Sequence, residues 1–230
     1  MGGMRSAGIL LAGLLLAGCQ SPDMAVSAIP DGAIVAPVLS PPPIGGLIPA
    51  STAIPVGAAA VPPSGFIAFC GRDPDQCLAP KDGASMVTLD AATWQTLWRV
   101  NTAWNTAVKP MDDAAHYGVV DYWTIPADGY GDCEDYALAK RKSLIDLGLP
   151  EEALRIAVVR TEDGTAHAVL DVATDHGDYV LDNLDAVILP WTDTHYTWIA
   201  RQMPGRTRWA FVGPAHMDDQ TIATADITPQ

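Results

Sequence analysis

The sequence predicts an α+β domain in which helices come first and an antiparallel sheet follows. Segments 90–107 and 133–148 carry helical patterns, and five short strand-like segments follow them along the chain. A run of helices followed by a meander of strands is typical of α+β proteins. The chain has 230 residues, which allows one ordinary domain with additional segments.

Residues 1–18 have the pattern of an export signal. An apolar run over residues 9–16 follows the single charge of Arg5 and is too short to span a bilayer. The run ends in Leu-Ala-Gly-Cys19, which resembles the lipobox of bacterial lipoproteins, where the cysteine carries the lipid. A plain cleaved signal and a buried apolar helix are the alternatives. We therefore expect a periplasmic protein anchored to the membrane through Cys19, and Gln20 favours the outer membrane.

Residues 19–64 are expected to be a tether rich in proline and alanine. Ten prolines lie between positions 20 and 64, and only two residues there are charged. No helical or strand period is sustained, because proline removes backbone donors and fixes φ. Such a segment lifts a domain off a membrane surface. The folded domain is accordingly predicted over residues 65–213, with a C-terminal tail over 214–230.

Charge and cysteine content exclude some functional classes. With 13 basic and 27 acidic residues the net charge is −14, which argues against binding to nucleic acid. Four cysteines are too few for a disulfide framework and are not spaced like a zinc ribbon. Cys70 and Cys77 bracket a turn-rich loop, and in an exported chain we expect them to form a disulfide. Free thiols or partners elsewhere are the alternatives.

The two predicted helices have clear boundaries. Asp90 is placed to cap the first helix, whose apolar residues recur mostly at intervals of three to four. In the second helix, acidic residues occupy the first turn, basic residues follow, and Gly148 and Pro150 mark the end. This is the charge order that a helix dipole favours. Cys133 is therefore expected on the first turn of a helix whose body is buried.

The predicted strands form a meander around one hairpin. They cover residues 155–160, 167–174, 179–183, 196–201 and 208–212. A turn at 175–178 joins the second strand to the third and pairs positions whose numbers sum to about 353. On that register His167 faces about residue 186, and Asp182 lies at the same edge of the sheet.

A helix that carries Cys133 across this edge would complete a Cys133, His167, Asp182 set. A thiolate nucleophile needs a base to accept its proton, and the base needs an acceptor that fixes its tautomer. A helix N-terminus also lowers the pKa of a thiol and supplies N–H groups to an oxyanion. These residue types alone are common in any chain, so their order and their placement carry the argument.

Three motifs surround these residues: GDCEDYA at 131–137, GTAHAVL at 164–170 and VLDN at 180–183. Together they resemble the bacterial transglutaminase-like cysteine proteinases, including LapG-type periplasmic members, over about residues 65–213. The resemblance implies a papain/transglutaminase-like domain. It also implies that Cys133 is the nucleophile, that His167 is the base, and that Asp182 orients the histidine.

Acidic residues beside the nucleophile raise the question of a cofactor. Asp132, Glu134 and Asp135 would raise the pKa of the Cys133 thiol, and a hard dication would remove this conflict. The resemblance implies calcium, with these three carboxylates as ligands. Capping of the helix is the alternative interpretation. We expect no organic cofactor.

These features predict a cell-envelope cysteine endopeptidase that cleaves an exported or surface protein, such as an adhesin, through an acyl-enzyme. A transglutaminase-type acyl transferase, a cell-wall peptide amidase and a non-catalytic binding lipoprotein are the alternatives. The sequence leaves open whether a regulatory membrane protein is a further partner. Trp123 precedes the cysteine motif and is a candidate wall of the site, with a core position as the alternative.

Overall fold

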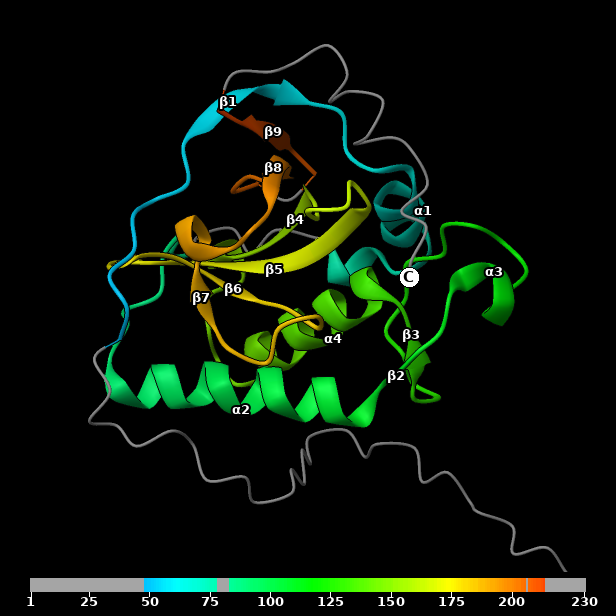
Figure 1. Ribbon diagram of the computed structural model, residues 1–230, viewed down its shortest axis with the longest axis horizontal. Coiled ribbons are helices and arrows are strands. Elements are labelled where there is room, and N and C mark those ends of the chain that lie inside the picture. Colours follow the sequence, from blue (N-terminus) through cyan, green and yellow to red (C-terminus); the bar gives the residue numbers. More distant parts are fainter. Residues whose placement is uncertain (1–47, 78–82, 206, 214–230) are drawn as a thin grey trace, which may run out of the picture.

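The computed structural model describes residues 48–77, 83–205 and 207–213, which build a seven-stranded antiparallel sheet with helices packed below it (Figure 1). The strand order is β1-β9-β8-β4-β5-β6-β7. The strands are β1 (Val56–Ala60), β4 (Leu154–Arg160), β5 (Ala166–Thr174), β6 (Gly177–Leu181), β7 (Leu189–Pro190), β8 (Thr197–Gln202) and β9 (Trp209–Val212). The predicted α+β fold is confirmed.

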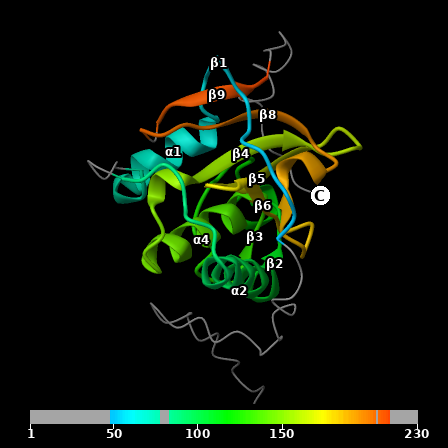
Figure 2. The same cartoon turned by 90° about the vertical axis from the view of Figure 1, so that its left-hand side faces the viewer.

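Two long helices form layers beneath this sheet. Helix α4 (Cys133–Asp146) packs against β4 and β5, and α2 (Ala91–Ala107) packs against α4 (Figure 2). Trp94 of α2 also packs against Tyr179 of β6. Asp90 caps α2, since its side chain accepts a hydrogen bond from the Thr93 amide at 2.7 Å. Both helices therefore begin where the sequence predicts.

Shorter elements connect these layers. They are α1 (Ser64–Arg72), α3 (Asp113–His116), the 3-10 turns η1 (Pro74–Gln76), η2 (Glu151–Ala153) and η3 (Trp191–Asp193), and a parallel pair of β2 (Lys109–Pro110) with β3 (Tyr130–Gly131). The predicted disulfide joins Cys70 in α1 to Cys77. Among the described residues, no helix is long and apolar enough to cross a membrane.

The central strands are buried on both faces. Ile156 and Val158 of β4 belong to the main core with α4, whereas Ala157 and Val159 belong to a second cluster on the opposite face. Burial on both faces explains why this strand reads as a continuous apolar run rather than as an alternating pattern.

The hairpin of β5 and β6 has a different register from the predicted one. Thr174 pairs with Gly177, and the last pair is Leu170 with Leu181, so the paired numbers sum to 351 rather than about 353. The turn is tighter than expected because Gly177 adopts a positive φ of 103°. Pairing ends at Leu181, and the chain then leaves the sheet at Asp182.

The predicted boundary of the tether is wrong at its C-terminal end. Residues 56–60 form strand β1, which pairs with β9, and Ile54 is 2% exposed. The side chain of Asp178 accepts a hydrogen bond from the Ile54 amide at 2.8 Å. The sequence gives no signal for this strand because its pairing partner lies about 150 residues away. The predicted signal peptide, the predicted lipidation site Cys19, the predicted tether before residue 48 and the predicted tail after 213 lie outside the described residues.

Candidate active site

The local structure around Cys133 places its thiol at the start of α4. Strand β3 leads directly into the helix, and Asp132 occupies the N-cap position with extended backbone. Its side chain makes no capping hydrogen bond, so capping does not explain this carboxylate. A side chain at Gly131 would lie 2.7 Å from Asp135 Oδ2, which requires glycine at this position. Cys133 itself is 5% exposed.

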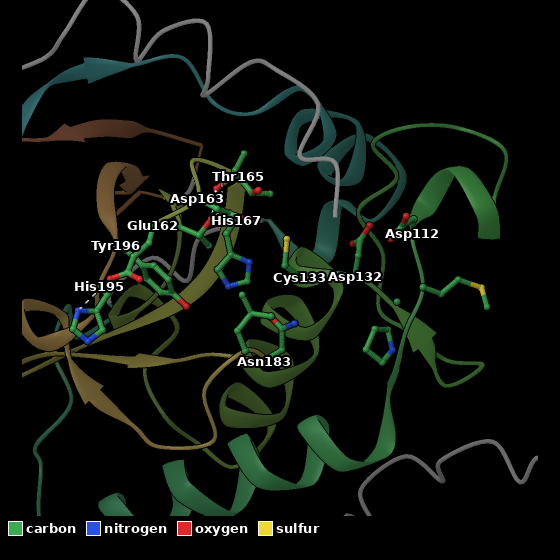
Figure 3. A pocket seen from close by; sticks show the side chains of 16 residues that line it. Asp112, Asp132, Cys133, Glu162, Asp163, Thr165, His167, Asn183, His195 and Tyr196 are labelled. Atoms are coloured by element: carbon green, nitrogen blue, oxygen red, sulfur yellow. Dashed lines mark hydrogen bonds and ion pairs between the residues drawn. The ribbon is translucent and has the colours of Figure 1, made fainter. Parts of the chain in front are cut away.

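The structure brings the three candidate catalytic residues together. His167 Nε2 lies 2.8 Å from Asp182 Oδ1, and both side chains are buried. The amide of Ala168, the next residue after His167, donates to Cys133 Sγ at 3.4 Å. Figure 3 shows the sulfur and the imidazole pointing into one cleft. Because Asp182 occupies Nε2, the Nδ1 atom of His167 is the nitrogen left to face the thiol.

A cleft of about 430 Å³ opens above these residues. Residues 110–112 line one side, the β4–β5 connection and the start of β5 line another, and Tyr196 lies at one end (Figure 3). The segment 110–112 is held by the β2–β3 pair and by the Met111 amide, which donates to the Gly131 carbonyl at 3.0 Å. Cys133 and His167 both line this cleft.

Three buried carboxylates gather beside the nucleophile. Asp113, Asp132 and Glu134, here named the carboxylate cluster, each offer an oxygen, and these oxygens lie within 4.8 Å of one another. Four oxygens of the cluster are buried without a hydrogen-bond partner: Asp113 Oδ1, both of Asp132 and Glu134 Oε1. Within the described part of the chain, no Lys or Arg forms an ion pair with them. Buried carboxylates without partners are costly, and a hard dication with oxygen ligands satisfies them.

The predicted ligand set shares two residues with this cluster. Asp132 and Glu134 belong to the cluster, whereas Asp135 lies beside it: one of its oxygens accepts a hydrogen bond from the Thr124 amide at 2.8 Å, and Oδ2 is buried without a partner. Asp113 is the third member of the cluster and was missed from the sequence. It belongs to the four-residue helix α3, which contacts β3, the strand that leads into α4.

The cluster changes the protonation of the site. Burial and mutual repulsion raise the pKa of Asp132 to about 7 and that of Asp135 to about 9. Burial and the charges of Asp132 and Asp135 also raise the pKa of Glu134 well above its usual range. The Cys133 thiol is 3.1 Å from Glu134 Oε2, and burial followed by the charges of Glu134 and Asp132 raises its pKa. Without a cation, the carboxylates therefore oppose ionisation of the nucleophile.

Two aromatic residues occupy positions that differ from those predicted from the sequence. Trp123 is 0% exposed and does not line the cleft, so its prediction as a wall is wrong. Its ring packs edge-on against Phe66, and its Nε1 donates to Asp121 at 2.7 Å. Tyr196 was predicted only as the start of a strand, yet its hydroxyl donates to Asp182 Oδ2. No local pattern marks this tyrosine, because its partner lies on another connection of the sheet.

The chain is similar to known proteins of solved structure. Three structures of Legionella pneumophila LapG resemble the chain: one at 29% identity with a TM-score of 0.43, a calcium-bound form at 26% and 0.46, and an EGTA-treated form at 29% and 0.42. They cover 48%, 54% and 47% of this chain, and the chain covers 63%, 74% and 62% of theirs. The chain thus spans less than two thirds of the first of these structures.

No curated protein sequence matches the chain. A family model described as bacterial transglutaminase-like cysteine proteinase, BTLCP, matches residues 56–216. The match begins at the first residue of β1, in agreement with the corrected boundary of the domain. It includes Cys133, strand β5 with His167, and Asp182. The chain therefore belongs to the bacterial transglutaminase-like cysteine proteinase family.

Proposed function

We propose that the protein is a cysteine endopeptidase that cleaves an exported or surface protein at Cys133. The observation that carries this proposal is the convergence of Cys133, His167 and Asp182 at one open cleft. Family membership supports a cysteine peptidase as the class of enzyme. We expect the substrate peptide to occupy this cleft, because Cys133 and His167 both line it.

Each residue of the set has a defined chemical task. His167 Nδ1 accepts the thiol proton, and the sulfur attacks the peptide carbonyl to form a tetrahedral intermediate. Asp182 holds Nε2–H and stabilises the imidazolium that forms. The first-turn N–H groups of the 14-residue helix α4 face the developing oxyanion. His167 then protonates the leaving amine, and water hydrolyses the acyl-enzyme.

We infer that Asp113, Asp132 and Glu134 hold a calcium ion, with Asp135 close by. Support comes from the four unpartnered oxygens of the carboxylate cluster. One of the similar LapG structures is described as calcium-bound and another as EGTA-treated. When bound, the ion supplies positive charge that offsets the carboxylates, so the pKa of Cys133 falls and a thiolate becomes accessible.

The cell envelope is the proposed location. Residues 1–18 direct export, lipid on Cys19 anchors the chain in the periplasm, and the outer membrane is the favoured side. A protease tied to this surface meets substrates that are exported or attached there. The Cys70–Cys77 disulfide agrees with an oxidising compartment.

A thiol-directed probe tests the proposed function. Iodoacetamide at pH 7 should alkylate Cys133 of the purified protein rapidly in calcium, slowly in EGTA, and at a background rate in Cys133→Ala. Cys133 is the free cysteine among the described residues, and the variant accounts for any labelling of Cys19. Equal labelling of wild type and Cys133→Ala in calcium would contradict the proposal. Incorporation of a fluorescent amine into protein, without cleavage, would favour an acyl transferase instead.

A further inference from the structure

Tyr196 contacts both partners of the histidine–aspartate pair. Its hydroxyl donates to Asp182 Oδ2, while His167 Nε2 occupies Asp182 Oδ1. The Leu184 amide donates to the same Oδ1 at 3.0 Å. Each oxygen of this buried carboxylate therefore has its own donor, and together the donors fix the plane of the carboxylate.

The ring of Tyr196 also confines the imidazole. The two rings pack edge to face, with centroids 5.6 Å apart and planes inclined by 63°. Figure 3 places Tyr196 beside His167, at the end of the cleft away from Asp132. Rotation of the imidazole away from Cys133 would displace this ring, so the tyrosine restricts the orientation of the base.

The segment that carries Tyr196 is itself held in place. Thr194 Oγ1 donates to the Trp191 carbonyl at 2.7 Å and accepts from Trp198 Nε1 at 3.1 Å. Trp191 and Trp198 pack edge to face at 5.9 Å, and both join the second apolar cluster with Tyr196. The phenol is therefore presented from an anchored loop rather than from a freely moving one.

We propose that Tyr196 is a positioning residue of the active site, which orients Asp182 through its hydroxyl and His167 through its ring. This inference rests on the proposed function, since it concerns the same base. The tyrosine touches no reacting atom; it acts through the carboxylate and the imidazole. Its hydroxyl stays protonated because burial and the charge of Asp182 raise its pKa.

Loss of the hydroxyl has a defined electrostatic effect. Burial opposes ionisation of Asp182, but the hydrogen bond and charge of His167, followed by the hydroxyl of Tyr196, hold its pKa below the usual value. Lys140 on α4 also faces Asp182, and Asp185 and Cys133 face Tyr196. Without the hydroxyl, the pKa of Asp182 rises and one of the donors that fix its plane is lost, so the carboxylate holds the imidazole less precisely.

The test uses Tyr196→Phe and Tyr196→Leu, with Tyr179→Phe as the matched control. Tyr179 is a buried tyrosine of β6 whose hydroxyl donates to the Pro49 carbonyl at 2.6 Å, outside the cleft. In calcium at pH 7, Tyr196→Phe should lower the rate of Cys133 alkylation by iodoacetamide about tenfold, because the imidazole is held less precisely beside the thiol. Tyr196→Leu should lower the rate further, because the imidazole also loses its packing. Tyr179→Phe should leave the rate unchanged.

A second measurement separates this inference from the proposed function. In the Cys133→Ala background, the downfield proton resonance of the His167–Asp182 hydrogen bond should shift or broaden with Tyr196→Phe and stay in place with Tyr179→Phe. An unchanged resonance together with an unchanged alkylation rate would overturn the positioning role. A wild type that is alkylated no faster than Cys133→Ala would sink the peptidase proposal, while the resonance would still decide the role of Tyr196.

Discussion

Two groups of buried acids in this protein are equally sheltered from water but differ in how their charge is balanced. In the sheet, Arg201 Nη1 bonds Asp171 at 2.6 Å and Asp178 at 2.8 Å, with all three side chains at most 4% exposed. These residues are here named the sheet cluster. In the carboxylate cluster, exposure is 3% at most, and no Lys or Arg of the described chain pairs with the acids.

The difference separates buried acids that pair with a cationic side chain of the protein from buried acids that do not. The sheet cluster is balanced by its own chain and ties down the N-terminal segment, because Asp178 also binds the Ile54 amide. One of its carboxylate oxygens lacks a partner, compared with four in the carboxylate cluster. A chain that balances one buried acidic group but not the other leaves the second open to an external cation.

The largest effect on stability is expected from removal of the Arg201 guanidinium, the cation of the sheet cluster. Arg201→Met leaves Asp171 and Asp178 buried without their partner, so the free energy of unfolding should fall by about 3–5 kcal/mol. Urea titration measures the loss. The exposed Arg208 is the matched control, and Arg208→Met should change stability by less than about 0.5 kcal/mol. A loss for Arg201→Met as small as that of the control would remove the contrast.

Added calcium should stabilise the folded protein, and it should do so through the carboxylate cluster and not through the sheet cluster. Calcium at 100 times its dissociation constant should raise the free energy of unfolding by about 2.7 kcal/mol relative to EGTA. Asp113→Asn combined with Asp132→Asn should abolish the rise, whereas Asp171→Asn should keep it. Differential scanning calorimetry in the two buffers provides the measurement. An equal rise in all three proteins would place calcium elsewhere.

The contrast also explains what the sequence could predict. Helix α4 with its cysteine and strand β5 with His167 follow from local patterns, because caps, charge order and periodicity lie within a few residues. The sequence also drew attention to Asp132 and Glu134 of the carboxylate cluster, since they adjoin the nucleophile.

The sequence could not predict features that depend on contacts between distant segments, because its patterns extend over only a few residues. Asp113, Tyr196 and strand β1 depend on partners from distant elements. The segments of Asp113 and β1 look like ordinary loops, and the strand predicted from Tyr196 onward shows no sign of its contact with Asp182. Strand β1 consists of Val-Gly-Ala-Ala-Ala at the sheet edge, mostly exposed, so it shows no apolar alternation. The register error at the hairpin arose because a two-residue turn and a four-residue turn fit the same Asp-His-Gly-Asp sequence.

The pH dependence of stability should differ between the two buffers. The pKa of Asp132 is raised to about 7 and that of Asp135 to about 9, both above unfolded values near 4. In EGTA, the stability that these two carboxyl groups contribute in their protonated form is fully present below about pH 4 and is lost as the pH rises toward 9. Each proton released adds a slope of at most about 1.4 kcal/mol per pH unit.

Calcium should flatten this decline because it favours the ionised carboxylates. Asp171 has its pKa raised to about 7, chiefly by burial, and titrates in both buffers. Subtraction of the two stability curves therefore isolates the carboxylate cluster. Parallel curves in calcium and EGTA, measured by thermal unfolding from pH 4 to 9, would contradict the assignment of the cation to these acids.

The smallest effect is also the sharpest, since one kind of substitution should act with opposite sign in the two clusters. Asp171→Asn deprives Arg201 of an ionic partner and should destabilise the protein in either buffer. Asp113→Asn in EGTA removes one of several repelling carboxylates and should stabilise it by about 1 kcal/mol. The asparagine carbonyl can still accept the hydrogen bond that the Tyr122 amide donates to Asp113. In calcium the sign for Asp113→Asn should reverse, because a ligand is lost. If Asp113→Asn destabilises in EGTA as well, the carboxylate cluster is balanced without a cation, and the two regions do not differ in kind.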